Sequence, residues 1–88
     1  MLKWRATTEA VTFDGVGELV YVLEVPSHGV TMWLRRDMTV AFANVDTCGY
    51  REGMRTSDAE REYEFVIGDF KRKLARDGMP DRGLEGVV

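Results

Sequence analysis

The residues best suited to covalent chemistry are the one cysteine, Cys48, and the one histidine, His28. A nucleophile–base pair needs the thiol and the imidazole within hydrogen-bond reach, with a third group that orients the ring. His28 lies in the turn-forming segment Pro26–Gly29 and Cys48 lies near a predicted strand end, so contact is sterically allowed. A solvated turn histidine and a small, buried or half-buried cysteine explain the same residues. We therefore predict that the protein is not an enzyme, with a small thiol enzyme as the least favoured alternative.

Metal and phosphate binding have little support in the pattern of residues. A zinc site takes three or four cysteine, histidine or carboxylate ligands, and the chain has one cysteine and one histidine. Asp14, Glu18 and Glu24 would bind a hard cation only weakly, and we expect them to be solvated. The segment Asp14–Glu18 lacks the lysine and hydroxyl of a P-loop and the third glycine of a dinucleotide fingerprint. We predict no metal and no cofactor.

The charge balance argues against nucleic acid as a direct partner. The 88 residues carry 12 basic and 15 acidic side chains, a net charge of −3, whereas neutralising phosphates requires a basic surface. The length and the hydrophobic content of 44% fit one folded domain with a modest core. A single cysteine fits a reducing compartment, and no apolar leader or membrane-spanning run is visible. We expect a cytoplasmic protein with no membrane partner.

Strand-like segments fill the first half of the chain. Leu2–Thr7 alternates between apolar and polar residues, and Ala10–Phe13 continues as an extended segment before the turn Asp14–Gly17. Leu19–Val25 is apolar on both faces and rich in β-branched residues. This segment is either a strand buried on both sides or a short helix.

Two further strands and a loop are predicted after Pro26–Gly29. Val30–Arg36 alternates, and its apolar face consists of Val30, Met32 and Leu34. After a tight turn at Arg36-Asp37, Met38–Val45 is predicted to be a strand. The residues expected to share one face of that strand are Met38, Val40 and Phe42. Asn44–Met54, which contains two glycines, is predicted to be a loop.

One helix is the most clearly marked element. Ser57 is a good N-cap, and Glu60 three residues later completes a capping box. Gly78 and then Pro80 are expected to end the helix. One face carries apolar residues at helical spacing: Tyr63, Val66, Ile67, Phe70 and Leu74.

The elements together predict an α+β fold. We expect an antiparallel meander of three to five strands with the C-terminal amphipathic helix packed across one face, where it covers the apolar side of Val30–Arg36. Residues 1–78 would form this single domain. Residues 79–88, which include two glycines and a proline, are predicted to be a flexible tail.

Trp33 is the residue most indicative of a binding function. If Val30–Arg36 is a strand, Trp33 lies with Arg35 on the face opposite the helix, with Arg36 after them and Tyr21 from the adjacent strand nearby. Tryptophan, tyrosine and arginine dominate the binding energy of protein interfaces. The alternative is that Trp33 closes a second small core with the N-terminal strand.

The acidic face of the helix is the second candidate surface. Glu60 and Glu64 lie one helical turn apart and would meet a basic groove on a partner. A solvated helix face explains the same two carboxylates.

The opening of the chain resembles that of a group of small phage and prophage proteins. These proteins begin with a Lys-Trp-Arg-like stretch, here Lys3-Trp4-Arg5, and continue with a segment like Glu9–Gly15. The proline that often lies between the two pieces is absent. The resemblance implies a mobile-element origin, a host-cytoplasmic location and, by analogy, inhibition of a host machine, as by anti-CRISPR proteins that counter antiviral defence.

We therefore expect a non-enzymatic protein-binding module that occupies the surface of a host protein or complex. The predicted contact residues are Trp33, Arg35, Arg36, Tyr21, Glu60 and Glu64. The alternative is a homo-oligomeric, for example homodimeric, structural or accessory phage protein, because a short meander with one helix cannot readily cover both faces of Leu19–Val25.

Overall fold

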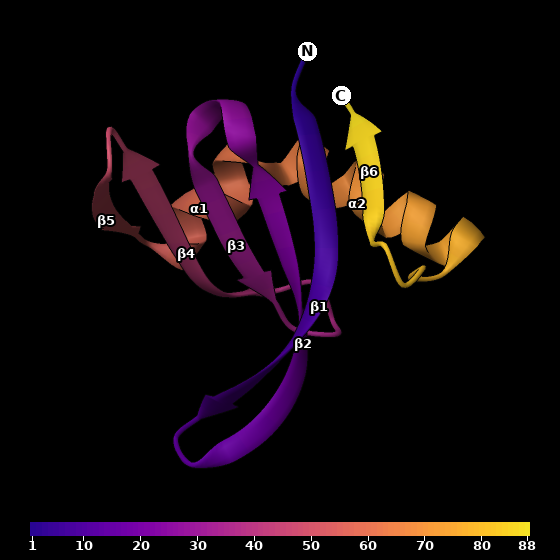
Figure 1. The fold of residues 1–88 in the computed structure, drawn as a ribbon, viewed down its shortest axis with the longest axis horizontal. Coiled ribbons are helices and arrows are strands. Elements are labelled where there is room, and N and C mark those ends of the chain that lie inside the picture. The colour runs from indigo at the N-terminus through magenta and orange to yellow at the C-terminus, as the bar shows by residue number, and fades with distance from the viewer.

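A six-stranded antiparallel sheet dominates the computed structural model, which describes all 88 residues. The strands in chain order are β1 (Lys3–Phe13), β2 (Val16–Val25), β3 (Val30–Leu34), β4 (Val40–Thr47), β5 (Tyr50–Met54) and β6 (Leu84–Val87). Across the sheet the order is β5-β4-β3-β2-β1-β6, so β1 to β5 form a meander and β6 lies on the outer side of β1 (Figure 1). The predicted α+β class is confirmed, with six strands in place of three to five.

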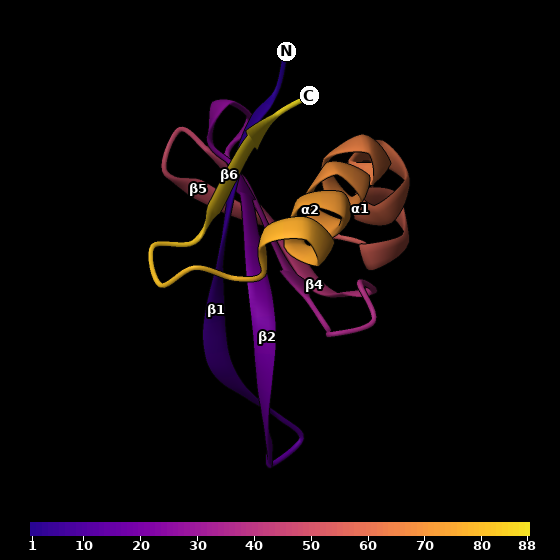
Figure 2. The same cartoon turned by 90° about the vertical axis from the view of Figure 1, so that its right-hand side faces the viewer.

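Two helices, α1 (Thr56–Glu62) and α2 (Glu64–Asp77), cover one face of this sheet. Figure 2 shows both helices on the same side of the strands, with the opposite side uncovered. The single predicted helix is therefore interrupted, and the break lies at Tyr63. The end at Gly78 is as predicted, because this glycine adopts a positive φ of 70° directly after α2. Neither helix is long and apolar enough to cross a membrane.

The main core fills the space between the helices and one sheet face. The predicted apolar face of β3 is fully buried there, and so are Val66 and Phe70 of the predicted helical stripe. Trp4 is 2% exposed and packs its ring edge-to-face against Phe70, with ring centroids 5.6 Å apart. These aromatic contacts hold α2 across β1.

The capping box predicted at Ser57 is wrong. The helix begins at Thr56 with Arg55 as its N-cap residue, and no side chain caps it. Glu60 instead reaches across to the sheet, where its carboxylate accepts a hydrogen bond of 3.0 Å from the backbone N–H of Val40. Glu60 therefore makes a tertiary contact between α1 and β4 in place of the predicted capping contact at the start of the helix.

The turn between β1 and β2 is the tight hairpin turn expected from its residues. Asp14 and Gly15 both adopt positive φ, 49° and 80°, as a two-residue turn that matches strand twist requires. β2 is a strand, which settles the alternative of a short helix at Leu19–Val25.

Two segments expected to be irregular are strands. The predicted loop Asn44–Met54 is a hairpin in which the end of β4 pairs with β5. The predicted flexible tail, residues 79–88, contains β6, and Lys3 to Ala6 of β1 pair with it. The ring of Trp4 lies directly over Gly86, where a Cβ would stand 2.4 Å from it. Glycine at that position lets an aromatic side chain cover the edge strand.

Candidate protein-binding face

The sheet face opposite the helices is the candidate site, and we call it the open face. An antiparallel sheet can leave one face to solvent, and that face is normally polar. Here it carries two aromatic rings in neighbouring strands, Trp33 of β3 and Phe42 of β4, which pair directly across the two strands. The prediction that Trp33 lies opposite the apolar side of β3 agrees with this arrangement.

Phe42 reaches the open face because β4 is irregular. The pairing shifts between Trp33 and Leu34, so that Leu34 faces Val40 while Trp33 faces Phe42. Val40 is consequently buried under the helices, whereas Phe42 is 49% exposed. The prediction that these two residues share one face with Met38 is therefore wrong, since a bulge reverses the alternation within β4.

The aromatic pair is held in place by defined contacts. The rings of Trp33 and Phe42 lie tilted, with centroids 5.3 Å apart. The indole N–H of Trp33 donates a 3.1 Å hydrogen bond to the carboxylate of Glu9 in β1. An aromatic surface fixed before binding loses little side-chain entropy when a partner covers it.

A hollow of about 260 Å³ lies beside Trp33 on the open face. Its charged lining is acidic on balance, with Glu9, Glu24 and Asp46 against Arg51. Gly29 also lines the hollow. A Cβ on this residue would stand 2.1 Å from the carbonyl oxygen of Asp46, so only glycine lets β4 approach so closely. The open face therefore presents aromatic surface next to a small acidic depression.

Salt bridges neutralise part of the surrounding charge. Arg5 pairs with Glu24 across β1 and β2, and this hydrogen-bonded contact raises the pKa of Arg5 further above its ordinary value. No salt bridge engages Glu9 or Asp46. These two carboxylates are therefore available to a basic group from outside.

Two of the three residues predicted to accompany Trp33 lie elsewhere. Tyr21 is 8% exposed on the helix side, edge-to-face with Phe70 at 5.3 Å, so its placement beside Trp33 is wrong. The guanidinium of Arg36 lies over the ring of Tyr21. Arg35 lies beyond the end of β3, 3.6 Å from the carboxylate of Glu18 and over the ring of Phe13. Both of these residues share a sheet face with Glu9, so Arg35 is on the same side as Trp33, as predicted. Arg35 and Arg36 thus brace the β1–β2 hairpin.

The two carboxylates of the predicted acidic helix face, Glu60 and Glu64, have different surroundings. Glu64 is exposed at the start of α2, whereas the carboxylate of Glu60 is engaged by the backbone of β4. The two residues do not form one free acidic face.

No hydrogen bond joins the cysteine to the histidine. Cys48 is exposed in the turn between β4 and β5. His28 lies in a short 3₁₀ turn, Pro26–His28, near the ring of Tyr63, and its side chain hydrogen-bonds Ser27. No cluster of three or more potential metal ligands forms.

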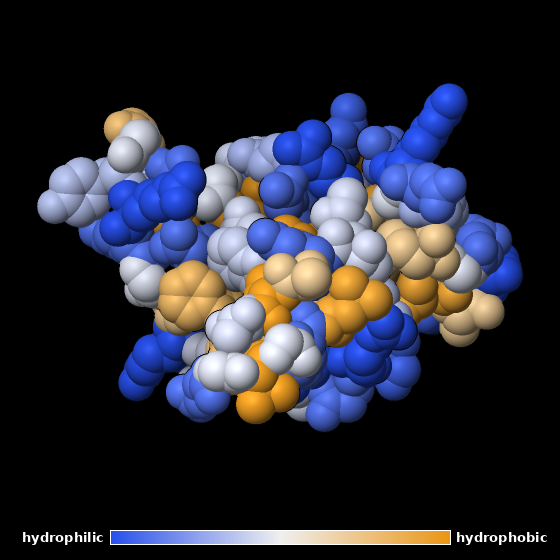
Figure 3. Space-filling model, turned by 60° about the horizontal axis from the view of Figure 1, so that its bottom comes forward, coloured by the Kyte–Doolittle hydropathy of each residue, from blue (hydrophilic) through white to orange (hydrophobic).

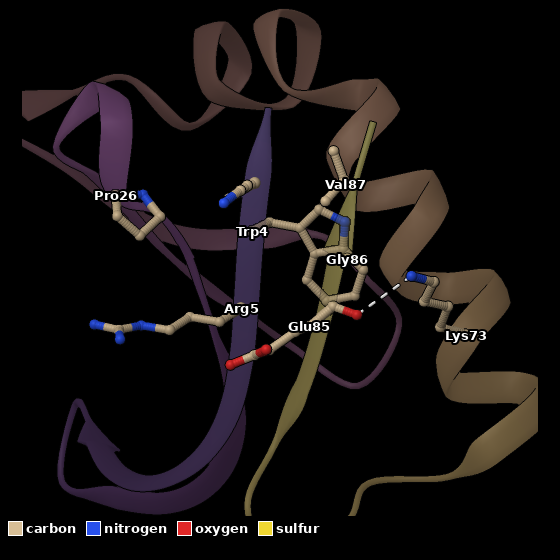
Figure 4. A pocket seen from close by; sticks show the side chains of 8 residues that line it. Trp4, Arg5, Pro26, Lys73, Glu85, Gly86 and Val87 are labelled. Atoms are coloured by element: carbon tan, nitrogen blue, oxygen red, sulfur yellow. Dashed lines mark hydrogen bonds between the residues drawn. The ribbon is translucent and has the colours of Figure 1, made fainter. Parts of the chain in front are cut away.

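A larger groove of about 610 Å³ borders β1 and β6, but its aromatic residue and two of its cations are engaged within the protein (Figure 4). Its aromatic residue, Trp4, belongs to the core, with its N–H bonded to Asp69 at 2.8 Å. Two of its cations are already engaged: Arg5 by Glu24, and Lys73 by the carbonyl of Glu85 at 3.2 Å. The contacts of Figure 4 fasten β6 to α2.

Sequence reasoning missed Phe42 and Glu9 as members of the open face. The alternation of Glu9 with Trp4 and Ala6 places it opposite them, so its position was open to prediction. Phe42 carries no such signal, because its orientation depends on the bulge.

No protein-family model, curated protein or solved structure matches this chain.

Proposed function

We propose that this chain is a non-enzymatic protein-binding module that acts through its open face. The observation that carries the proposal is the preorganised pair of half-buried Trp33 and exposed Phe42 on a sheet face that no element covers. Aromatic rings that are rigid before binding are typical anchors of protein interfaces.

The partner that fits this face carries a basic side chain beside an apolar one. The apolar group would cover Phe42, and a lysine or arginine would enter the hollow, where it would meet Glu9 and Asp46. A guanidinium could also lie against the exposed part of the Trp33 ring. Such complementarity adds specificity and speeds association.

The biological role that we propose is inhibition of a host protein or complex in the host cytoplasm by occupation of its surface. This part rests on the resemblance of the opening residues to phage proteins. The open face supplies the means, since an inhibitor of this size must act through a surface.

Capture from host lysate with a matched pair of variants tests the proposal. Phe42→Ala removes an exposed ring from the open face, and Phe65→Ala removes one that is 70% exposed on α2. We expect a protein retained by wild type and by Phe65→Ala to be lost or strongly depleted with Phe42→Ala. Equal retention by both variants would show that the open face is not the interface.

A further inference from the structure

The β1–β2 hairpin extends beyond the rest of the sheet as a two-stranded arm, residues Glu9–Val20. Pairing of β2 with β3 stops at Tyr21, and pairing of β1 with β6 stops at Ala6. Within the arm the two strands therefore pair only with each other, and Figures 1 and 2 show it projecting away from the helices. A two-stranded ribbon is only marginally stable in water unless something packs against it.

The arm carries exposed apolar side chains. Val16 and Leu19 are both exposed near its end. Figure 3 views the molecule from the end where the arm projects, and hydrophobic side chains gather in the middle of the face seen there. Arg35 braces the arm at Phe13 and Glu18, but its outer edge along β1 is left free.

The free outer edge of β1 is a template for another strand. From Thr8 to Thr12 alternate residues direct backbone N–H and C=O groups outward, and one residue in this stretch, Glu9, is charged. Proteins normally protect exposed edges with charged residues, as β5 does with Arg51 and Glu52. The edge of the arm has little such protection.

The sequence of this edge is self-complementary about Ala10. In an antiparallel pair centred on Ala10, the alanine faces its own copy and Thr8 faces Thr12 twice, which is a favourable cross-strand pair. Glu9 faces Val11 of the other copy, so the two carboxylates do not oppose each other. Antiparallel pairing of β5 with its own copy would be centred on Glu52 and would place two carboxylates face to face. Pairing of the free part of β2 with its own copy would do the same at Glu18.

We infer that the arm binds a second copy of this chain by antiparallel pairing of β1 with β1, centred on Ala10. The surface is distinct from the Trp33–Phe42 pair. This pairing would join two copies edge to edge and leave an aromatic pair on each one.

Site-specific cross-linking tests both the partner and the register. In a Cys48→Ser background, Ala10→Cys would place two thiols on facing residues, whose Cα atoms lie about 4.5–5.5 Å apart in antiparallel pairs, within the range of a disulfide. We expect mild oxidation to produce a covalent dimer on a non-reducing gel. Ala75→Cys, which is also exposed but lies on α2, is the matched control and should remain monomeric.

The register is tested by mixing chains. Thr8→Cys mixed with Thr12→Cys should cross-link as a heterodimer, while each variant alone should do so much less. Ala10→Lys should abolish the dimer in sedimentation equilibrium without loss of the folded circular dichroism spectrum, whereas Ala75→Lys should not.

Two results would overturn the inference. One is a wild-type chain that sediments as a monomer throughout the micromolar range. The other is Ala10→Cys cross-linking no faster than Ala75→Cys. If Ala10→Lys lost a captured host protein while the wild type proved monomeric, the edge would serve a strand of that protein and not a second copy. None of these outcomes would change the comparison of Phe42→Ala with Phe65→Ala.

Discussion

The two tryptophans occupy opposite sides of the same sheet and have different roles. Trp4 is 2% exposed, donates its N–H to Asp69 of α2 and covers Gly86 of β6. Trp33 is half-buried on the open face, donates its N–H to Glu9 and contacts Phe42. The surroundings of Trp4 are complete within the monomer, whereas one side of the Trp33–Phe42 pair has no cover. The same side chain therefore stabilises the fold in one place and remains available in the other.

Removing the first tryptophan should have the largest effect on stability. We expect Trp4→Ala to lower the free energy of unfolding by about 3–5 kcal/mol, because it leaves a large cavity against Phe70 and uncovers Gly86. Urea denaturation followed by circular dichroism would measure the loss. A domain of this size has little stability to spare, so partial unfolding of the variant at room temperature is consistent with the expectation. A loss below about 1 kcal/mol would contradict the placement of Trp4 in the core.

Removing the hydrogen-bond partner of Trp4 should have the second largest effect. Asp69→Ala leaves the buried indole N–H without an acceptor and removes the carboxylate near Arg72 and Lys73. We expect a loss of about 1–3 kcal/mol in the free energy of unfolding. Asp69→Asn, whose amide oxygen can still accept the bond, should recover part of it. Equal losses in the two variants would indicate that the hydrogen bond contributes little.

Trp33→Ala should destabilise the fold less than either change at the Trp4 site. It removes a partly exposed ring and its contact with Phe42, and we expect a loss of about 1 kcal/mol. Thermal unfolding of the variant beside Trp4→Ala would compare the two directly. A loss as large as that of Trp4→Ala would mean that Trp33 closes a second core and is not free for a partner.

The smallest effect is expected at the hydrogen-bond partner of Trp33. Glu9→Ala removes an acceptor at the surface, where water can replace it, so the free energy of unfolding should change by less than about 0.5 kcal/mol. Its effect should appear in binding, because the hollow loses one of the two carboxylates that no salt bridge engages. Denaturation curves of Glu9→Ala and Asp69→Ala, measured together, would show whether the acceptor of Trp4 contributes more to stability than the acceptor of Trp33.

Much of the architecture could be predicted from periodicity alone. The apolar side of β3, the hairpin turn at Asp14-Gly15 and the end of the helix at Gly78 agree with the prediction because each depends on residues close in sequence. Placing Trp33 opposite the apolar residues of β3 needed only the alternation of one strand. These features required no knowledge of which elements would pack together.

The features that could not be predicted depend on contacts between distant elements. β2 is apolar on both faces, so its alternation gave no basis for placing Tyr21 under the helices. Val20 and Val22 of this strand are buried within the monomer outside the main core, so its two apolar faces do not by themselves require a second copy. Gly86 makes β6 look irregular in the sequence, yet the ring of Trp4 covers this glycine.

The role of the open face is tested most directly by measuring stability and affinity in the same variant. Trp33→Ala and wild type would be compared by denaturation and by titration against a host protein captured by the wild type. We expect at least a tenfold loss of affinity, about 1.4 kcal/mol, in a variant that remains folded. Unchanged affinity in a folded Trp33→Ala variant would contradict the central claim that the open face is the binding surface.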